Sequence, residues 1–488
     1  AEKRRETDSC GMIGWAGDEH SVPILLQGLD KLEYRGYDSA GLAVFESEGT
    51  KIVRAVGKLR YLYKAVEDVQ FSGTIGMGHT RWATHGRPSE ANAHPHQYGT
   101  TTVVHNGIIE NHQDIRHRLE EGGHHFCSET DTEIIAHLID DYYKESRDLE
   151  HAIRQATKEL EGSFAIVVMN DDLPEQLVAA RQNSPLILGL GEEENLVASD
   201  IPAILSITRE ILVMEDGEMA KITRKSCQLL SLEDGSSIER ASRRVDWTPA
   251  MAQKGGYKHF MLKEIFEQPS AVSNTVRSRI LLEEADVLLD GSGLPTDRLS
   301  SLKKILFLAC GTSYHAGLLG KYLIENLARV PAEVEIGSEF RYRDPLVDQN
   351  TWAVAISQSG ETADTIAAAK EAMGHGAPLL SICNVKDSTL TRMADGIIYT
   401  HAGPEIGVAS TKAFTTQMSA VFLLALWLGR QTGNLSKEKA SRYLDQLMHV
   451  PSSMEKAISK SDEIRKIAKI YQHSDNMLFL GRNLEYPI

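Results

Sequence analysis

Cysteine, positive charge and long apolar runs are all in short supply in this chain of 488 residues. Its five cysteines include no CxxC pair, which excludes a disulfide scaffold and favours a reducing compartment. Lys and Arg total 52 against 68 Asp and Glu, and the net charge of −16 makes nucleic acid and anionic membranes poor partners. The longest strongly apolar stretch, residues 418–428, is too short to cross a bilayer.

The composition is otherwise that of an ordinary globular protein, with 42% hydrophobic and 25% charged residues. The length allows about three domains. The first nine residues, AEKRRETDS, have no apolar core and so do not form a secretory signal. We therefore expect a cytoplasmic protein that binds neither membrane nor nucleic acid.

Residues 10–240 are predicted to form one α+β domain. Short apolar runs typical of strands cluster near both ends of this segment, and helical patterns at 21–32 and 132–143 lie between them. That order favours layers of helices and sheets over βαβ repetition. A polar segment with Pro249 and the pair Gly255-Gly256 follows, and we assign residues 241–269 as a linker.

From residue 270 to 440 strands are expected to alternate with helices. Apolar runs at 305–310, 332–336, 352–357, 379–384 and 396–400 predict an α/β domain with a doubly wound parallel sheet. Ligand sites in such sheets lie beyond the carboxyl ends of the strands, here the loops after 310, 357 and 400. The run MLFLGRNLE at 477 resembles ILFLACGTS at 305, so residues 455–488 are expected to begin a second such domain, which is truncated.

Several side chains in the first domain suit one substrate. A thiolate at Cys10 can attack an amide carbonyl, and Arg81 can bind a carboxylate in bidentate fashion. Asp131 can hold an ammonium group, and the Asn106 amide with the Gly107 N–H can face a developing oxyanion. A carboxylate, an ammonium group and an amide together describe free glutamine.

Plainer interpretations of these residues stay open at this point. A lone cysteine beside a strand is often a small buried hydrophobe, Arg81 would equally fit a surface ion pair, and Asn106-Gly107 is a common hairpin turn. Ten of the 18 histidines fall between 79 and 137. The histidines at 94 and 96 have no cysteine or carboxylate at ligand spacing, so we expect no metal site.

Two loops of the second domain carry small hydroxyl residues between a strand and a helix. Neither ACGTS nor SQSGET contains a P-loop lysine, yet hydroxyl groups and helix N-terminal N–H groups suffice to hold a phosphate. Serine and threonine before a helix usually serve as N-caps, but two such loops at neighbouring strand ends favour binding. The candidates are Thr312, Ser313, Ser357, Gln358, Ser359 and Thr362.

Taken together, the motifs resemble one family. CGMIGWAG, LEYRGYDSAGLAV, HTRWATHG, NAHPH, HNGIIEN and ETDTE resemble the glutaminase domain of the glutamine–fructose-6-phosphate aminotransferases, or glucosamine-6-phosphate synthases. KGGYKHFMLKEIFEQP, ACGTSYHAG, SQSGETADT and EIGVASTKAFTTQ resemble the isomerase half of that family, which is built from SIS (sugar isomerase) domains. The joint occurrence of HTRWATHG and SQSGETADT makes the resemblance specific.

The resemblance implies an N-terminal-nucleophile hydrolase fold with αββα layers for the first domain. It implies that Cys10 is the catalytic nucleophile with its own α-amine as general base, and that Asn106 and Gly107 form the oxyanion hole. It also implies a passage for ammonia that is gated by Trp82, and no cofactor. Glutamine would be held by Arg81, Trp82, Thr84, His85, Gly107 and Asp131.

Nine residues precede Cys10, and an acylated amine cannot accept a proton. We therefore expect either that residues 1–9 are a leader that is removed, or that glutaminase activity is impaired. In the isomerase half the resemblance implies fructose 6-phosphate as the sugar, contacts from Val408 and Ser410, and pairing as a homodimer. The family's isomerisation residues lie beyond the YPI segment at 486–488, so these 488 residues are not expected to complete the synthase step alone.

Two other functions compete with this enzyme. Another cysteine-first amidotransferase, making phosphoribosylamine or asparagine, would need a pyrophosphate-sugar loop or an SGGxDS nucleotide loop, and the sequence contains neither. A catalytically silent sugar-phosphate-binding or regulatory protein fits the blocked cysteine and the missing C-terminal residues. The intact glutamine pocket argues against that second alternative, so we expect an enzyme.

Overall fold

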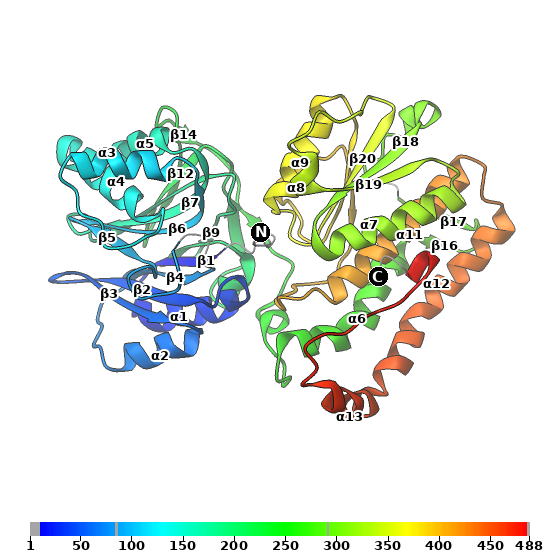
Figure 1. Cartoon of the computed structure of the whole chain (residues 1–488), viewed down its shortest axis with the longest axis horizontal. Coiled ribbons are helices and arrows are strands. Elements are labelled where there is room, and N and C mark those ends of the chain that lie inside the picture. The colour runs from blue at the N-terminus through cyan, green and yellow to red at the C-terminus, as the bar shows by residue number, and fades with distance from the viewer. Residues whose placement is uncertain (1–9, 83–85, 290–291, 486–488) are drawn as a thin grey trace. The chain divides into compact units, whose positions relative to one another are not determined.

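The computed structural model describes residues 10–82, 86–289 and 292–485. The chain divides into two compact units between Gln253 and Lys254, and each is drawn in Figure 1. Among the helices of the described segments, none is long and apolar enough to cross a membrane.

The first unit is built around two antiparallel sheets. One has the strand order β15-β11-β9-β10-β1-β4-β2-β3, and the other has the order β14-β13-β12-β8-β7-β6-β5. The strands of the first sheet are β1 (Gly11–Ala16), β2 (Ser39–Glu46), β3 (Gly49–Val56), β4 (Ile75–Arg81), β9 (Ile187–Leu190), β10 (Asn195–Ala198), β11 (Glu210–Val213) and β15 (Arg243–Arg244). Those of the second are β5 (His96–Tyr98), β6 (Thr101–Ile109), β7 (Gly162–Asn170), β8 (Gln176–Gln182), β12 (Glu218–Thr223), β13 (Cys227–Ser231) and β14 (Ser237–Ile238).

Helices cover the outer faces of both sheets, as Figure 1 shows. A buried apolar cluster that includes Met12, Met77 and Val167 draws side chains from both sheets and forms the central core. Helices α1 (Ser21–Leu32) and α2 (Leu59–Glu67) lie on the first sheet, and α3 (His112–Glu121), α4 (Glu133–Ser146) and α5 (Leu149–Glu159) belong to the layer on the second. The expected α+β fold with αββα layers is confirmed.

The second unit contains a five-stranded parallel sheet with the order β19-β18-β20-β21-β22. The predicted parallel α/β fold is therefore confirmed, with strand ends that differ from the predicted runs by at most one residue. The strands are β18 (Lys304–Ala309), β19 (Ala332–Ile336), β20 (Thr351–Ser357), β21 (Leu379–Cys383) and β22 (Gly396–Tyr399), and a small antiparallel pair is formed by β16 (Ile280–Leu281) and β17 (Asp286–Val287).

Both faces of this sheet are covered, which explains why the inner strands β18, β20 and β21 are largely apolar and buried. One apolar cluster packs α6 (Phe260–Val276), α7 (Gly311–Leu327), α11 (Lys412–Gln431) and α12 (Lys437–Ile458) on one face. A second cluster packs α8 (Gly337–Phe340), α9 (Ala363–Gly374) and α10 (Thr389–Met393) on the other. The chain leaves β18 toward β19 on one side and continues at β20 on the other, so the strand order reverses between β18 and β20. Open α/β sheets bind ligands beyond the carboxyl ends of such strands.

Two segments differ from the sequence-based expectations. Helix α6 begins at Phe260, inside the range 241–269 assigned as a linker. The strand expected at 477–480 is wrong, because these residues are irregular and exposed, after α12 and α13 (Ser461–Tyr471). A strand needs a neighbour to bond its backbone groups, and none of the described segments pairs with this one.

Candidate functional site

Cys10 lies at the end of the first sheet, directly before β1. Antiparallel pairing of β1 with β4 sets Gly11 opposite Thr80, so Cys10 meets the residues that follow β4. The Trp82 N–H donates to the Cys10 sulfur at 3.1 Å. Burial raises the pKa of the Cys10 thiol to about 11, so the thiol is protonated at neutral pH and needs a base before it can attack.

Asn106 connects the two sheets at this point. Its side-chain Nδ2 donates to the Cys10 carbonyl oxygen at 2.6 Å. The Nε2 of His79 lies 3.0 Å from the Asn106 Oδ1 and 3.0 Å from the His105 carbonyl oxygen. Both of these partners are acceptors, so Nε2 carries the proton and donates. Asn106 lies inside strand β6, paired with Ala165, so the interpretation of Asn106-Gly107 as a hairpin turn is wrong.

Arg81 and Asp131 bring opposite charges to the same thiol. The Arg81 charge lowers the pKa of Cys10 and the Asp131 charge raises it, although both effects are smaller than that of burial. Arg81 is buried and its Nη2 donates to the Gly86 carbonyl at 3.1 Å, so it does not belong to a surface ion pair. Asp131 is also buried, and its Oδ2 accepts the Ile109 N–H at 2.9 Å. A cation and an anion therefore flank the nucleophile, as a zwitterionic amino acid requires.

Gly107 is the position where only glycine fits. Its φ of +133° is rarely adopted by other residues, and an added Cβ would lie 2.0 Å from the Ser163 carbonyl oxygen. Trp82 contacts the ring of Tyr37 edge-on, with centroids 5.0 Å apart. Two of the expected glutamine contacts, Thr84 and His85, lie outside the described residues.

The histidines of this unit form ring contacts with one another and hydrogen bonds. The rings of His79 and His94 are 4.1 Å apart, and those of His94 and His96 are 5.0 Å apart. His96 Nε2 lies 3.1 Å from Thr130 Oγ1, and His105 Nδ1 lies 3.0 Å from Thr132 Oγ1. Within the described segments no group of three or more His, Cys, Asp or Glu side chains is arranged to hold a metal ion.

The two hydroxyl-rich loops of the second unit follow the neighbouring strands β18 and β20. Because these strands are parallel and paired, both loops lie at the same edge of the sheet. Ser357 Oγ lies 3.2 Å from Thr362 Oγ1 and accepts the Gly360 N–H at 3.0 Å. Ser313 is buried and donates to Gln417 Oε1 at 3.1 Å. Thr312 is exposed in the first turn of α7.

The N-cap interpretation of these residues does not fit the two helices. The N-cap of α7 is Cys310 and that of α9 is Thr362, and neither side chain makes a capping hydrogen bond. The backbone of Gln358 joins the loop after β20 to the loop after β21, since its carbonyl oxygen accepts the Asn384 N–H at 3.3 Å. Ser359 Oγ accepts the Glu361 N–H at 3.1 Å. The N-cap side chains of both helices therefore make no capping hydrogen bond, and a helix N-terminus of this kind suits an anion.

Val408 and Ser410 lie on the loop that precedes α11. Val408 is 57% exposed. The Ser410 hydroxyl donates to Glu405 Oε2 at 2.9 Å, so that its oxygen can act toward a ligand only as an acceptor. Sequence reasoning missed the charged side chains around this loop, namely the buried Lys263, Glu264, Glu405 and Lys412 and the partly exposed Glu267. The charged residues within otherwise apolar helix patterns were the available signal.

The chain is similar to two domain families. The glutamine amidotransferase domain family matches residues 79–206, which include Arg81, Asn106 and Asp131. The SIS domain family matches residues 298–427, which include the loops after β18 and β20.

Similarity to known proteins extends over both units of this chain. A glutamine–fructose-6-phosphate aminotransferase (isomerizing) of Clostridium tetani is 47% identical over 481 residues, covering 98% of this chain and 78% of that protein. A protein of the same name from Thermus thermophilus is 47% identical over 480 residues, with the same coverage. Among solved structures, the C-terminal domain of glucosamine-fructose-6-phosphate aminotransferase from Francisella tularensis is 42% identical, covers 48% of this chain and 65% of that one, and superposes with a TM-score of 0.46.

Proposed function

The chain belongs to the glutamine–fructose-6-phosphate aminotransferase family, and from this premise we propose that it hydrolyses glutamine at Cys10 and passes the ammonia to fructose 6-phosphate. The observation that carries the proposal is the convergence on Cys10 of a buried cation, a buried anion and the amide of Asn106. These three groups match the carboxylate, the ammonium group and the developing oxyanion of a glutamine substrate.

The glutaminase step begins with removal of the thiol proton. With its pKa raised to about 11 by burial, the Cys10 thiol is not ionised at pH 7. We assign the role of base to the α-amine of Cys10 itself, which becomes available when residues 1–9 are removed and has a reference pKa of about 7.7–8.0. The thiolate attacks the glutamine amide carbon, and the oxyanion is bound by the Asn106 Nδ2 and the Gly107 N–H. The protonated α-amine returns the proton to the amide nitrogen, so that neutral ammonia leaves, and water then hydrolyses the thioester to glutamate and regenerates the thiol.

Glutamine recognition is assigned to the flanking charges. The Arg81 guanidinium binds the α-carboxylate, and the Asp131 carboxylate binds the α-ammonium group. Trp82, Thr84 and His85 complete the set, with Trp82 as the gate for ammonia. Because these charged groups are buried, the effective dielectric constant around the substrate is lower than in water, and each electrostatic contact is stronger.

Fructose 6-phosphate is assigned to the second unit. The phosphate dianion would be bound by hydroxyl groups and first-turn N–H groups of α7 and α9, with no lysine required. Val408 and Ser410 would contact the sugar. The residues assigned to the phosphate are Thr312, Ser313, Ser357, Gln358, Ser359 and Thr362.

We further propose that the isomerase units pair as homodimers, which sedimentation analysis tests. We also propose that these 488 residues alone do not complete the synthase step, which an assay of glucosamine 6-phosphate formation tests.

Two measurements test the main proposal. Glutamate release from glutamine is expected for the chain that begins at Cys10 and should be lost in Cys10→Ala. Cys227 is a partly buried cysteine on β13, and the control variant Cys227→Ala should keep the activity. Calorimetric titration should detect fructose 6-phosphate binding. Sugar binding without glutaminase activity in a chain shown by mass to begin at Cys10 would favour the catalytically silent alternative, and absence of sugar binding would remove the sugar assignment.

A further inference from the structure

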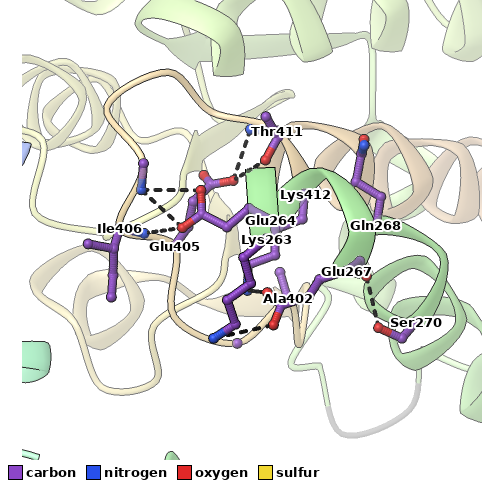
Figure 2. A network of polar contacts seen from close by, with 12 residues as sticks. Lys263, Glu264, Glu267, Gln268, Ser270, Ala402, Glu405, Ile406, Thr411 and Lys412 are labelled. Atoms are coloured by element: carbon purple, nitrogen blue, oxygen red, sulfur yellow. Dashed lines mark hydrogen bonds and ion pairs between the residues drawn. The ribbon is translucent and has the colours of Figure 1, made fainter. Parts of the chain in front are cut away.

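Two buried carboxylates accept hydrogen bonds from the backbone of the loop before α11, one from helix α6 and one from the loop itself, as Figure 2 shows. Glu264 of α6 is 2% exposed, and its carboxylate accepts the Ile406 N–H at 2.6 Å and the Gly407 N–H at 3.0 Å. Glu405 accepts the Thr411 N–H at 2.9 Å, the Ala413 N–H at 3.1 Å and the Ser410 hydroxyl at 2.9 Å. The loop is therefore bound at its start by Glu264 and at its end by Glu405.

Buried lysines balance part of this negative charge. Lys412 Nζ lies 2.7 Å from Glu267 Oε2, and Lys263 Nζ lies 3.5 Å from Glu267 Oε1. Lys412 is itself buried, on the first turn of α11. A buried charge is costly unless it is paired and hydrogen-bonded. The Lys412–Glu267 pair thus joins α11 to α6, and Glu264 lies on the same helix as this pair.

The contact between Glu264 and the loop leaves no spare space. A Cβ added to Gly407 would lie 2.4 Å from Glu264 Oε2. Burial raises the pKa of Glu264, whereas the Ile406 and Gly407 N–H groups lower it. The two N–H groups are thus the principal partners of a carboxylate that has been taken out of water. Between the two anchored ends, Val408 projects into solvent.

We propose that Glu264 is a positioning residue for sugar recognition: by binding the Ile406 and Gly407 N–H groups it holds Val408 and its neighbours where the sugar of fructose 6-phosphate binds. The inference rests on the sugar site proposed above. It assigns Glu264 to the sugar and not to the phosphate, because the phosphate loops at 312–313 and 357–362 have no hydrogen bond to Glu264 among those described.

The test compares two ligands on one variant. Glu264→Gln keeps the size of the side chain but removes its charge and replaces one acceptor oxygen with an NH₂ group. An NH₂ group cannot accept the hydrogen bond of the Ile406 or Gly407 N–H. Fructose 6-phosphate affinity is expected to fall about tenfold, the order expected for loss of a charge-assisted hydrogen bond. The affinity of inorganic phosphate, measured in competition with the sugar phosphate, should change by less than about twofold. A residue that only stabilises the fold would move both affinities or neither.

A matched control is available at the opposite edge of the same sheet. Asp395 Oδ2 accepts the Leu379 N–H at 2.8 Å, at the start of β21, so Asp395→Asn removes a carboxylate of the same kind far from the loop. It should leave both affinities unchanged. Gly407→Ala serves as a second variant, because its Cβ displaces the Glu264 carboxylate, and it should reproduce the selective loss of sugar affinity even where Glu264→Gln does not fold.

Hydrogen exchange separates this inference from the sugar assignment. The peptide that covers 403–411 should exchange faster in Glu264→Gln than in the wild type, with no ligand present. Faster exchange with no sugar binding by the wild type would confirm the anchoring and overturn the role in sugar recognition together with the proposed sugar site. Wild-type sugar affinity in folded Glu264→Gln, or unchanged exchange, would overturn the inference while leaving the proposed function in place.

Discussion

At the scale of single residues, the amide of Asn106 is held at both of its ends. His79 donates to Oδ1 and the Cys10 carbonyl accepts from Nδ2, so the amide cannot rotate without losing a buried hydrogen bond. Burial lowers the pKa of His79 to about 3, which keeps the ring neutral. So low a pKa makes His79 a poor base for the Cys10 thiol, and its hydrogen bond to Oδ1 suits it to orient Asn106.

We predict that His79→Leu lowers kcat for glutamine hydrolysis by about ten- to a hundredfold, because the oxyanion donor loses its orientation. The KM for glutamine should stay near the wild-type value, since Arg81 and Asp131 are unchanged. His137→Leu is the control, because His137 is equally buried but stacks on Tyr98 in another part of the unit. Equal kcat values for His79→Leu and the wild type would contradict the positioning role.

The second residue-scale prediction concerns the base. Chains that begin at Cys10 should hydrolyse glutamine about 10²–10⁴ times faster than chains shown by mass to begin at Ala1, because an acylated amine cannot accept the thiol proton. The rates are compared at pH 7 and pH 8.5, and the faster chain should gain activity as the amine, with a reference pKa of about 7.7–8.0, loses its proton. Equal rates for the two chains would refute the assignment of the α-amine.

At the scale of elements, strand β6 carries the oxyanion residues and β7 constrains them. Gly107 pairs with Phe164 on β7 in a conformation with positive φ. The next strand thus leaves no room for a side chain exactly where the site needs an exposed backbone. The site depends on the pairing of β6 with β7 as much as on the motif HNGIIEN.

We predict that Gly107→Ala destabilises the chain by several kcal/mol and abolishes glutaminase activity, because the Cβ would meet the Ser163 carbonyl oxygen at 2.0 Å. Gly123→Ala is the control for strain alone, since Gly123 has φ +94° and nothing within 4 Å of the added Cβ. It should cost only about 1–2 kcal/mol. Urea unfolding measures both losses, and similar values for the two variants would show that the contact with Ser163 carries no energy.

At the scale of the whole molecule, the buried histidines make the first unit sensitive to acid. Burial lowers the pKa of His79 and His96 to about 3 and that of His94 well below its usual value. The unfolded chain takes up protons below pH 6.5, while the folded chain does not. Folding is therefore favoured most above pH 6.5, and this contribution is lost progressively as the pH falls toward 3.

We predict that the free energy of unfolding of the first unit falls between pH 7.5 and pH 5.5, by about 1 kcal/mol per pH unit for each of these histidines below pH 6. Hydrogen exchange of the buried amides of β1 and β4 measures it. Glu133, whose pKa is lowered to about 2, loses its own contribution only below about pH 4.5, outside this window. A constant or rising free energy over the window would contradict the neutral state of the histidine cluster.

Local sequence determined the layout of both units. Alternating apolar runs and helical periods depend on which face each residue turns to a core, and this information is present in any short window. The strands of the parallel sheet and the α1 and α4 helices were predicted for this reason. The motifs around Cys10, Arg81 and Asp131 could also be assigned to one substrate, because the chemistry of a thiol, a guanidinium and a carboxylate is a property of the residue itself.

Only the tertiary structure decided which of these groups meet and what holds them. His79 reaches Asn106 across two sheets, and Glu264 reaches Gly407 over 143 positions of sequence, and neither contact leaves a periodic signal. The run MLFLGRNLE at 477 has a strand-like pattern but stays irregular, because no neighbouring strand bonds to it among the described residues. Hydrogen-bond partners and buried charge pairs belong to two segments at once, so the pattern of one segment cannot specify them.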